Sequence, residues 1–363
     1  MNHLSKSSKT VVFHEVGVPE VLKLEQVEVS YPGPQEVRIQ VKSIGINRAD
    51  AMYRQGMYIE NPIFPAKLGY EAAGVIEAIG SEVSNLSVGD MVNVIPGFSL
   101  LSYSSYGEYI TMPSYAVHKY PSNLSYSEAA ALWTSYLTMY GMIVNSGKLK
   151  SGEFVVVNAA SSSAGLAAIQ MINYVGGISI ALTTSSKKKE ALLKAGASHV
   201  IVTAEEDIAT EVLKITDEAL LKSGASYVIV TGEEDIATKV LKITDNVGAH
   251  LILDPVVGAK FSNLLSSVAE NGKVFVYGAL SHESASFPAF DVLMKTPTIR
   301  GYSAIEVLGN IEVLIQAITF INKGVTEGKL KPIIDKVFSL DEIVEAHKYL
   351  ESNQQFGKIV VNI

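Results

Sequence analysis

The order of apolar and polar residues changes character part-way along the chain. From residue 9 to about residue 120, short runs of alternating apolar and polar residues are separated by turn residues, as in Glu36–Val41 after Pro32–Pro34. Such alternation is typical of half-buried strands. We therefore predict an antiparallel, β-rich first domain over residues 1–128.

The second part of the chain has longer apolar runs. Ser125 and Glu128 have the spacing of a capping box, and Ala129–Leu132 behind them predicts a helix. Helical segments then alternate with the continuously apolar runs Phe154–Val157, Ile178–Leu182, Leu251–Leu253 and Val274–Tyr277. Such runs suit a doubly wound α/β domain, with a parallel sheet buried on both faces, over residues 129–303. Residues 304–363 are expected to form two helices and a last strand that returns to the first domain.

One segment of the second domain is duplicated. Glu190–Asp217 and Glu218–Asp245 differ only at Ala195/Ser223, His199/Tyr227, Ala204/Gly232 and Glu211/Lys239, so 24 of 28 positions match. Each copy reads as the end of a helix, a short strand and a helix, and a continuous helix is expected over residues 205–222. The second copy therefore adds either a seventh strand at the sheet edge or a unit that is looped out or swapped.

Composition excludes several classes of protein. The formal net charge is −8, without a basic stripe, which argues against nucleic-acid binding. The chain has no cysteine, which removes disulfides, thiolate catalysis and cysteine-ligated zinc. The N-terminus lacks the apolar core of a secretory signal, and no apolar run approaches the ~20 residues that span a bilayer. A cytoplasmic enzyme is the simplest class.

The turn between the first apolar run and its helix indicates a phosphate site. Backbone N–H groups there and at the helix N-terminus can hold a pyrophosphate, and small residues let it approach. Ala160 and Ser162 stand where the first two glycines of the usual pattern would be, and Gly165 remains, so we expect the cofactor to contact Ala160, Ser162, Ser163, Ala164 and Gly165. An ordinary tight turn is the alternative.

The end of the second apolar run bears on the choice of cofactor. Residues 183–188 contain no Asp or Glu to bind a ribose 2′-hydroxyl. Thr184, Ser185 and Lys188 can instead hold a 2′-phosphate through charge-assisted hydrogen bonds, which favours NADPH. A solvated, lysine-rich helix start is the alternative.

Several motifs in order give the chain a family resemblance. They are Gly45–Asp50, Gly69–Val75, the Ser-Ser-Ser-Ala-Gly turn at 161–165, Tyr277–Ser281 and Phe356–Lys358. Together they resemble the zinc-free quinone oxidoreductases of the medium-chain dehydrogenase/reductase superfamily, over residues 9–363 apart from one repeat unit. The resemblance implies a GroES-like β-rich catalytic domain and a Rossmann cofactor domain.

The resemblance also implies roles for single residues. Asn47 and Tyr58 would border the nicotinamide and substrate pocket between the domains, with Tyr53 nearby. Cofactor contacts would come from Thr134, Thr138, Lys188, Gly278, Leu280 and Lys358. Each tyrosine could instead be packing, and Lys358 a surface lysine.

A zinc site is not expected. The zinc-dependent branch of the family carries Cys in place of Asn47 and His in place of Tyr70. Glu71 alone cannot complete a site that needs three or four ligands, so we predict no metal and a structural Glu71.

These inferences predict hydride transfer from NADPH to a quinone or similar small conjugated acceptor, with Asn47, Tyr58 and Tyr53 as catalytic candidates. The partners expected are a small conjugated carbonyl substrate and a second copy of the chain in a homodimer. An enoyl or alkenal reductase on the same fold and a non-catalytic NADPH-binding protein remain the alternatives.

Overall fold

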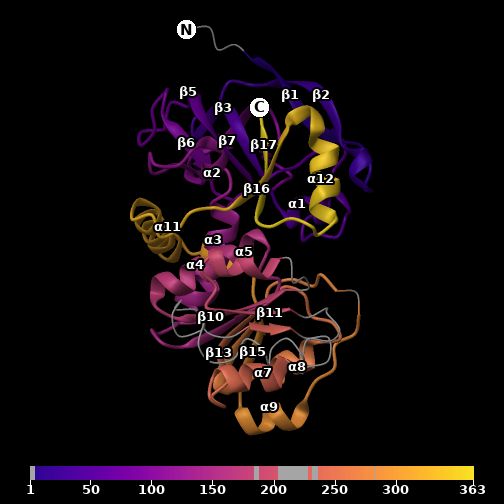
Figure 1. Cartoon of the computed structure of the whole chain (residues 1–363). Helices are drawn as coiled ribbons and strands as arrows, with labels where there is room; N and C mark the ends of the chain where they lie inside the picture. Colours follow the sequence, from indigo (N-terminus) through magenta and orange to yellow (C-terminus); the bar gives the residue numbers. More distant parts are fainter. Residues whose placement is uncertain (1–4, 184–187, 203–227, 231–235, 282) are drawn as a thin grey trace. The chain divides into compact units, whose positions relative to one another are not determined.

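The computed structural model describes residues 5–183, 188–202, 228–230, 236–281 and 283–363. It divides the chain into two compact units, Met1–Ser135 with Ile318–Ile363, and Tyr136–Ala317. Figure 1 labels the elements of both units. Two helices, α3 (Trp133–Tyr140) and α11 (Ile311–Thr326), contain the points where the chain passes from one unit to the other. In the described part of the chain, no helix is long and apolar enough to cross a membrane.

The first unit is built from two sheets. A small antiparallel sheet has the order β2-β1-β4, and a larger one has the order β16-β17-β3-β5-β6-β8, with β7 also paired to β3. The strands are β1 (Lys6–Phe13), β2 (Lys23–Val29), β3 (Glu36–Ile46), β4 (Ala66–Lys67), β5 (Glu71–Ile79), β6 (Met91–Val94), β7 (Tyr109–Pro113), β8 (Val117–Lys119), β16 (Ile334–Ser339) and β17 (Lys358–Asn362). Alternate residues of these strands point into one apolar core that includes Val37, Ile39 and Val41 of β3. The predicted β-rich domain is confirmed.

In the described part of this unit, three α-helices belong wholly to it: α1 (Arg48–Arg54), α2 (Tyr126–Ala129) and α12 (Ile343–Glu351). Ser125 caps α2, because its hydroxyl accepts from the Glu128 N–H while the Glu128 carboxylate accepts from the Ser125 N–H. The predicted capping box is confirmed, but the expected helix over Ala129–Leu132 is wrong. The helix begins directly after its cap, at Tyr126, and ends at Ala129.

The end of the chain, from Ile318 onward, belongs to the first unit. β17 pairs antiparallel with β3, with Val360 opposite Gly45 and Val361 opposite Ile44. This pairing brings Lys358 next to the segment around residue 47, although more than 300 residues separate them in sequence.

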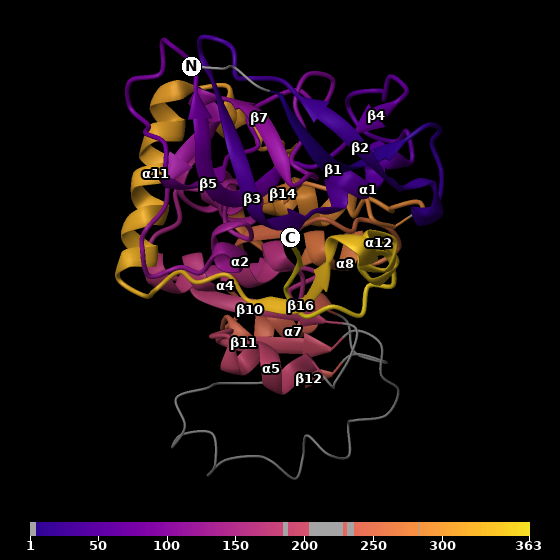
Figure 2. The same cartoon turned by 90° about the horizontal axis from the view of Figure 1, so that it is seen from above.

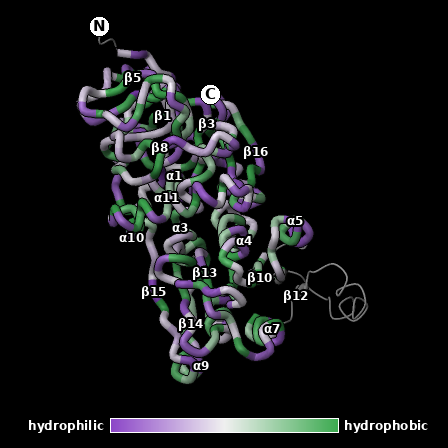
Figure 3. The backbone as a smooth tube through the Cα atoms, turned by 90° about the vertical axis from the view of Figure 1, so that its left-hand side faces the viewer, coloured by the Kyte–Doolittle hydropathy of each residue, from purple (hydrophilic) through white to green (hydrophobic). Residues whose placement is uncertain are grey.

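The second unit contains a parallel sheet with the order β12-β11-β10-β9-β13-β14-β15. Its strands are β9 (Phe154–Val157), β10 (Ile178–Thr183), β11 (His199–Val202), β12 (Val228–Val230), β13 (Ala249–Asp254), β14 (Val268–Val276) and β15 (Thr298–Gly301). Its helices are α4 (Ser163–Val175), α5 (Lys189–Lys194), α7 (Ile236–Ile243), α8 (Phe261–Ser266), α9 (Ala289–Lys295) and α10 (Ile305–Leu308). Leu251–Leu253 of β13 form the apolar stretch drawn in green in Figure 3, and all three are buried. The parallel α/β domain predicted from continuous apolar runs is confirmed.

The duplicated segment contributes two neighbouring strands. β11 comes from the first copy and β12 from the second, and they pair in parallel with Val200 opposite Val228 and Val202 opposite Val230. Paired residues are therefore 28 positions apart, which is one repeat length. Figure 2 shows β11, β12 and α5 together at one side of the unit. The prediction of a seventh strand at the sheet edge is confirmed, whereas the helix expected over residues 205–222 lies outside the described residues.

Candidate functional site

The turn after β9 has the strand–turn–helix geometry that the sequence predicted. β9 ends at Val157, and Ser162 caps α4, with its hydroxyl accepting from the Gly165 N–H at 3.0 Å. Ala159 lies in the left-handed region, at φ 50°, so the chain reverses sharply before the helix. The N-terminus of this 13-residue helix presents N–H groups and a positive dipole end, which together suit a phosphate.

Gly165 is the remaining glycine of this turn because the backbone approaches it closely. A Cβ at this position would lie 2.6 Å from the Cα and from the carbonyl oxygen of Ala160. The first turn of α4 can therefore pack on residues 159–160 only without a side chain at position 165. Ala160, at one of the other glycine positions, is fully buried.

A lysine lies next to this turn. The Lys188 ammonium donates to the Ser161 hydroxyl at 3.4 Å, although the two residues are 27 positions apart. The structure thus brings together the predicted phosphate turn and the predicted 2′-phosphate lysine. Thr184 and Ser185, assigned to the same task, lie outside the described residues.

Two further predicted cofactor residues lie at the same edge of the sheet. Gly278 and Leu280 follow β14, and the Leu280 N–H donates to the Pro255 carbonyl at 3.0 Å, directly after β13. A Cβ at position 278 would lie 2.7 Å from that carbonyl oxygen. The carboxyl ends of β9, β13 and β14 therefore gather the turn and the 278–280 segment, and ligands of doubly wound sheets bind at this edge.

Sequence reasoning missed the pair that holds this edge together. Asn158 donates to the Asp254 carboxylate at 2.8 Å, which also accepts from the N–H groups of Val256 and Val257. Burial raises the pKa of the Asp254 carboxyl. Their shared position directly after two buried strands was the available signal, since carboxyl ends of neighbouring parallel strands meet.

The first unit contains a buried ionic network. The Lys358 ammonium lies 2.5 Å from Glu71 Oε2 and 2.6 Å from Asn47 Oδ1, and Lys358 and Glu71 are each 1% exposed. Asn47 Nδ2 donates to Glu71 Oε2 at 3.0 Å and to the Gly45 carbonyl at 3.3 Å. The structural role expected for Glu71 fits this placement.

The same network fixes the start of α3. The second carboxylate oxygen of Glu71 accepts from the Thr134 N–H at 2.7 Å. Thr134, predicted to face the cofactor, is thereby tied to Glu71, while Thr138 on the same helix falls in the second unit. Lys358 is predicted to contact the cofactor, but its ammonium binds Glu71 and Asn47 within the first unit. The side-chain oxygen of Asn47 accepts from Lys358, and its amide nitrogen donates to Glu71 and to the Gly45 carbonyl.

These contacts do not fit a zinc ion. An ion held by Glu71 and the residue at position 47 would have to displace the Lys358 ammonium or lie beside its positive charge. Amide and phenol groups at positions 47 and 70 are also poor replacements for thiolate and imidazole ligands. Among the described residues, no group of three His, Cys, Asp or Glu side chains could hold a metal.

The two candidate tyrosines differ in accessibility. Tyr58 is half-buried, and its ring lies edge-on to Tyr70 with centroids 6.0 Å apart. Burial raises the pKa of the Tyr58 phenol, and a hydrogen bond from Tyr70 opposes this shift. Tyr53 is 1% exposed and packs edge-on against Phe13, so its ring is part of the core.

Two family models and a curated relative match this chain. A family model described as alcohol dehydrogenase GroES-like domain matches residues 33–122, and one described as zinc-binding dehydrogenase matches residues 223–361. The chain is 31% identical over 359 residues to a quinone oxidoreductase-like protein 2 homolog of Nematostella vectensis, covering 98% of this chain and 89% of that protein.

Two other matches extend the comparison. The synaptic vesicle membrane protein VAT-1 homolog of Rattus norvegicus is 28% identical over 346 residues, covering 91% of this chain and 77% of that protein. The structure of Escherichia coli quinone oxidoreductase complexed with NADPH superposes with a TM-score of 0.80 at 23% identity, covering 98% of this chain and 100% of that one. The superposed structure shares the fold described above.

Proposed function

The chain belongs to the zinc-free quinone oxidoreductase type of the medium-chain dehydrogenase/reductase family, and on that premise we propose that it transfers a hydride from NADPH to a quinone or similar small conjugated acceptor. The observation that carries the proposal is the pairing of Lys188 with Ser161 beside the phosphate turn. It places a cation beside the turn that would hold the cofactor's phosphates.

The residues of the second unit fit the cofactor. The N-terminus of α4 and the hydroxyls of Ser161, Ser162 and Ser163 offer donors for a pyrophosphate. Lys188 offers a charge for the 2′-phosphate, and the sequence from 183 to 188 offers no carboxylate to repel it. NADPH, when bound, supplies the hydride.

The proton requirement of the reaction also fits the chain. A reduced quinone takes its proton from water readily, so the site needs little acid catalysis. Tyr58 keeps its hydroxyl proton at neutral pH, as an ordinary phenol does, and burial raises its pKa further, so it can donate a hydrogen bond to an acceptor carbonyl. A cytoplasmic location and a homodimer remain predictions.

Cofactor choice is tested with Lys188→Ala. Loss of one charge-assisted contact, worth ~1.5–3 kcal/mol, should weaken NADPH binding by about ten- to a hundredfold and leave NADH binding unchanged. Lys194→Ala is the matched control, because it removes the same charge from the far end of α5, where Lys194 pairs with Glu190 in solvent. Equal affinity of the unmodified protein for NADH and NADPH would contradict the choice of cofactor.

The reaction itself is tested by NADPH oxidation with a panel of quinones, enones and aldehydes. We expect quinones to support the fastest turnover. Activity confined to enones would assign an enoyl or alkenal reductase, and tight NADPH binding without oxidation of any acceptor would assign a non-catalytic binder.

A further inference from the structure

Three neighbouring side chains of the first unit carry buried polar atoms without a partner. Among the described residues, these atoms are Asp50 Oδ1, Arg54 Nε and Nη1, and His347 Nδ1 and Nε2. All three residues are 0% exposed. Buried polar groups in folded proteins are almost always hydrogen-bonded, to protein or to ordered water, so this concentration needs an explanation.

Each of the three side chains lies close to Tyr106. Asp50 and Arg54 are four residues apart on α1 and so lie on one face of that helix. The Tyr106 hydroxyl donates to Asp50 Oδ2 at 3.0 Å, and the Tyr106 ring lies edge-on to the His347 imidazole at 5.9 Å. The charge of Arg54 acts on the pKa of both Tyr106 and His347, as expected for close neighbours.

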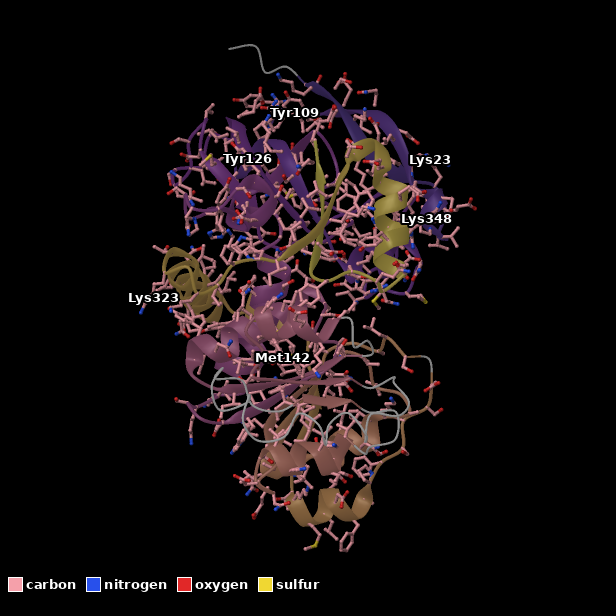
Figure 4. All side chains as sticks on the ribbon, viewed as in Figure 1. Lys23, Tyr109, Tyr126, Met142, Lys323 and Lys348 are labelled. Carbon is pink, nitrogen blue, oxygen red and sulfur yellow. The ribbon has the colours of Figure 1, made fainter. Side chains whose placement is uncertain are left out.

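His347 points inward from α12, which packs on α1. The next residue, Lys348, labelled in Figure 4, lies on the outer side of the helix and pairs with Glu20 and Glu345. At the far side of the group, the remaining Arg54 nitrogen forms an ion pair with Glu351, which is 26% exposed. The three side chains are therefore buried where α1 and α12 pack on each other, beside Tyr106.

The charges of Asp50, Arg54 and His347 indicate which kind of molecule could bind between them. Arg54 is matched by Glu351, and burial lowers the pKa of His347 to about 3, so its imidazole is neutral. An anion would meet the Asp50 carboxyl, and a cation would meet the Arg54 guanidinium. The unpartnered atoms include both donors and acceptors: the Arg54 N–H groups and one imidazole N–H donate, and the other imidazole nitrogen accepts. Asp50 Oδ1 accepts when the carboxyl is ionised and donates when it is protonated.

We propose that Asp50, Arg54 and His347 enclose an internal solvent site that binds water molecules, about two in number, because one water makes only ~3 hydrogen bonds. The occupant is neutral, small and both donor and acceptor, as this set of atoms requires. The site adjoins the ionic network, since Asp50 Oδ2 also accepts from the Asn47 N–H at 2.8 Å. It stands independently of the proposed reaction.

The wild-type protein provides the first test. A high-resolution electron-density map should show ordered water within hydrogen-bond distance of Asp50 Oδ1, Arg54 and His347. A map with no density there, or with a chloride or other ion, overturns the proposal.

Magnetic relaxation dispersion of water provides the test in solution, because it counts long-lived internal water. His347→Phe removes two of the five hydrogen-bonding atoms and should lower that count. Tyr349→Phe, which changes a hydroxyl on the same helix that donates to Asp335 at the surface, is the control and should leave the count unchanged. An unchanged count in His347→Phe together with a higher melting temperature would mean that the site is dry, and would overturn the proposal. If His347→Phe fails to fold, the wild-type map alone decides.

Discussion

Replacing Lys358 by Met tests whether the buried ionic network holds the first unit together. Methionine keeps an unbranched apolar side chain and removes the ammonium, so the Glu71 carboxylate, 1% exposed, is left with only the donors of Asn47 and Thr134. Removing one partner of a buried pair costs about 3–5 kcal/mol, because an uncompensated charge stays buried. That is a large part of a typical total stability of ~5–15 kcal/mol.

The double variant Lys358→Met with Glu71→Gln separates charge from packing. It leaves neither charge unpaired, so the two changes should cost about 1–3 kcal/mol less together than the sum of the single changes. Urea unfolding gives each free energy, and the single tryptophan, Trp133, is a reporter next to Thr134 because it is fully buried.

Lys348→Met is the matched control, since it removes a lysine from surface pairs with Glu20 and Glu345 and should cost much less than Lys358→Met. Strict additivity in the double variant, or a Lys358→Met cost no larger than that of Lys348→Met, would refute the reasoning.

Three other predictions follow from the structure. Burial raises the pKa of the Asp50 carboxyl to about 7 from 3.8, so the stability that its protonated form contributes is present below about pH 4 and lost as pH rises through 7. Asp50→Asn should remove up to about 4 kcal/mol of the pH dependence of the unfolding free energy measured in urea. The same pH dependence in the variant as in the wild type would contradict the assignment. Tyr58→Phe should leave kcat within about threefold of the wild-type value, because quinone reduction needs little acid catalysis, whereas Tyr58→Ala should raise KM. A loss of kcat of about a hundredfold in the Phe variant would instead make Tyr58 the proton donor. Deleting residues 218–245 should leave a folded protein that binds NADPH, because the first copy supplies the same sequence, and failure to fold would show that both copies belong to the core.

The features predicted correctly are those whose signal is local. The cap of α2, the turn between β9 and α4, and the parallel strands are written in residues a few positions apart, where spacing and apolar runs determine conformation. The added edge strand could also be predicted, because a whole repeat keeps its apolar residues in register.

The features missed depend on residues far apart in sequence. Lys358 and Glu71 are 287 positions apart, and Asp50 and Tyr106 are 56 positions apart. The residues next to Lys358 and Asp50 in the sequence do not indicate that these two side chains are buried. The sequence predicts a cofactor contact for Lys358, and it gives no sign of the ion pair with Glu71 or of the burial of Asp50, Arg54 and His347. The pairing of both β17 and β5 with β3 brings Lys358 next to Glu71, and the packing of α12 on α1 brings His347 toward α1.

The register of β11 and β12 has a consequence for the evolution of this sequence. Because equivalent residues of the two copies pair side by side, the duplication replaced one sheet edge by another with nearly the same sequence. Unequal recombination between the copies would add or remove a whole unit and leave the phosphate turn, which precedes both copies, untouched. Copy number at this edge is thus a heritable variable that selection can act on without altering the cofactor-binding residues.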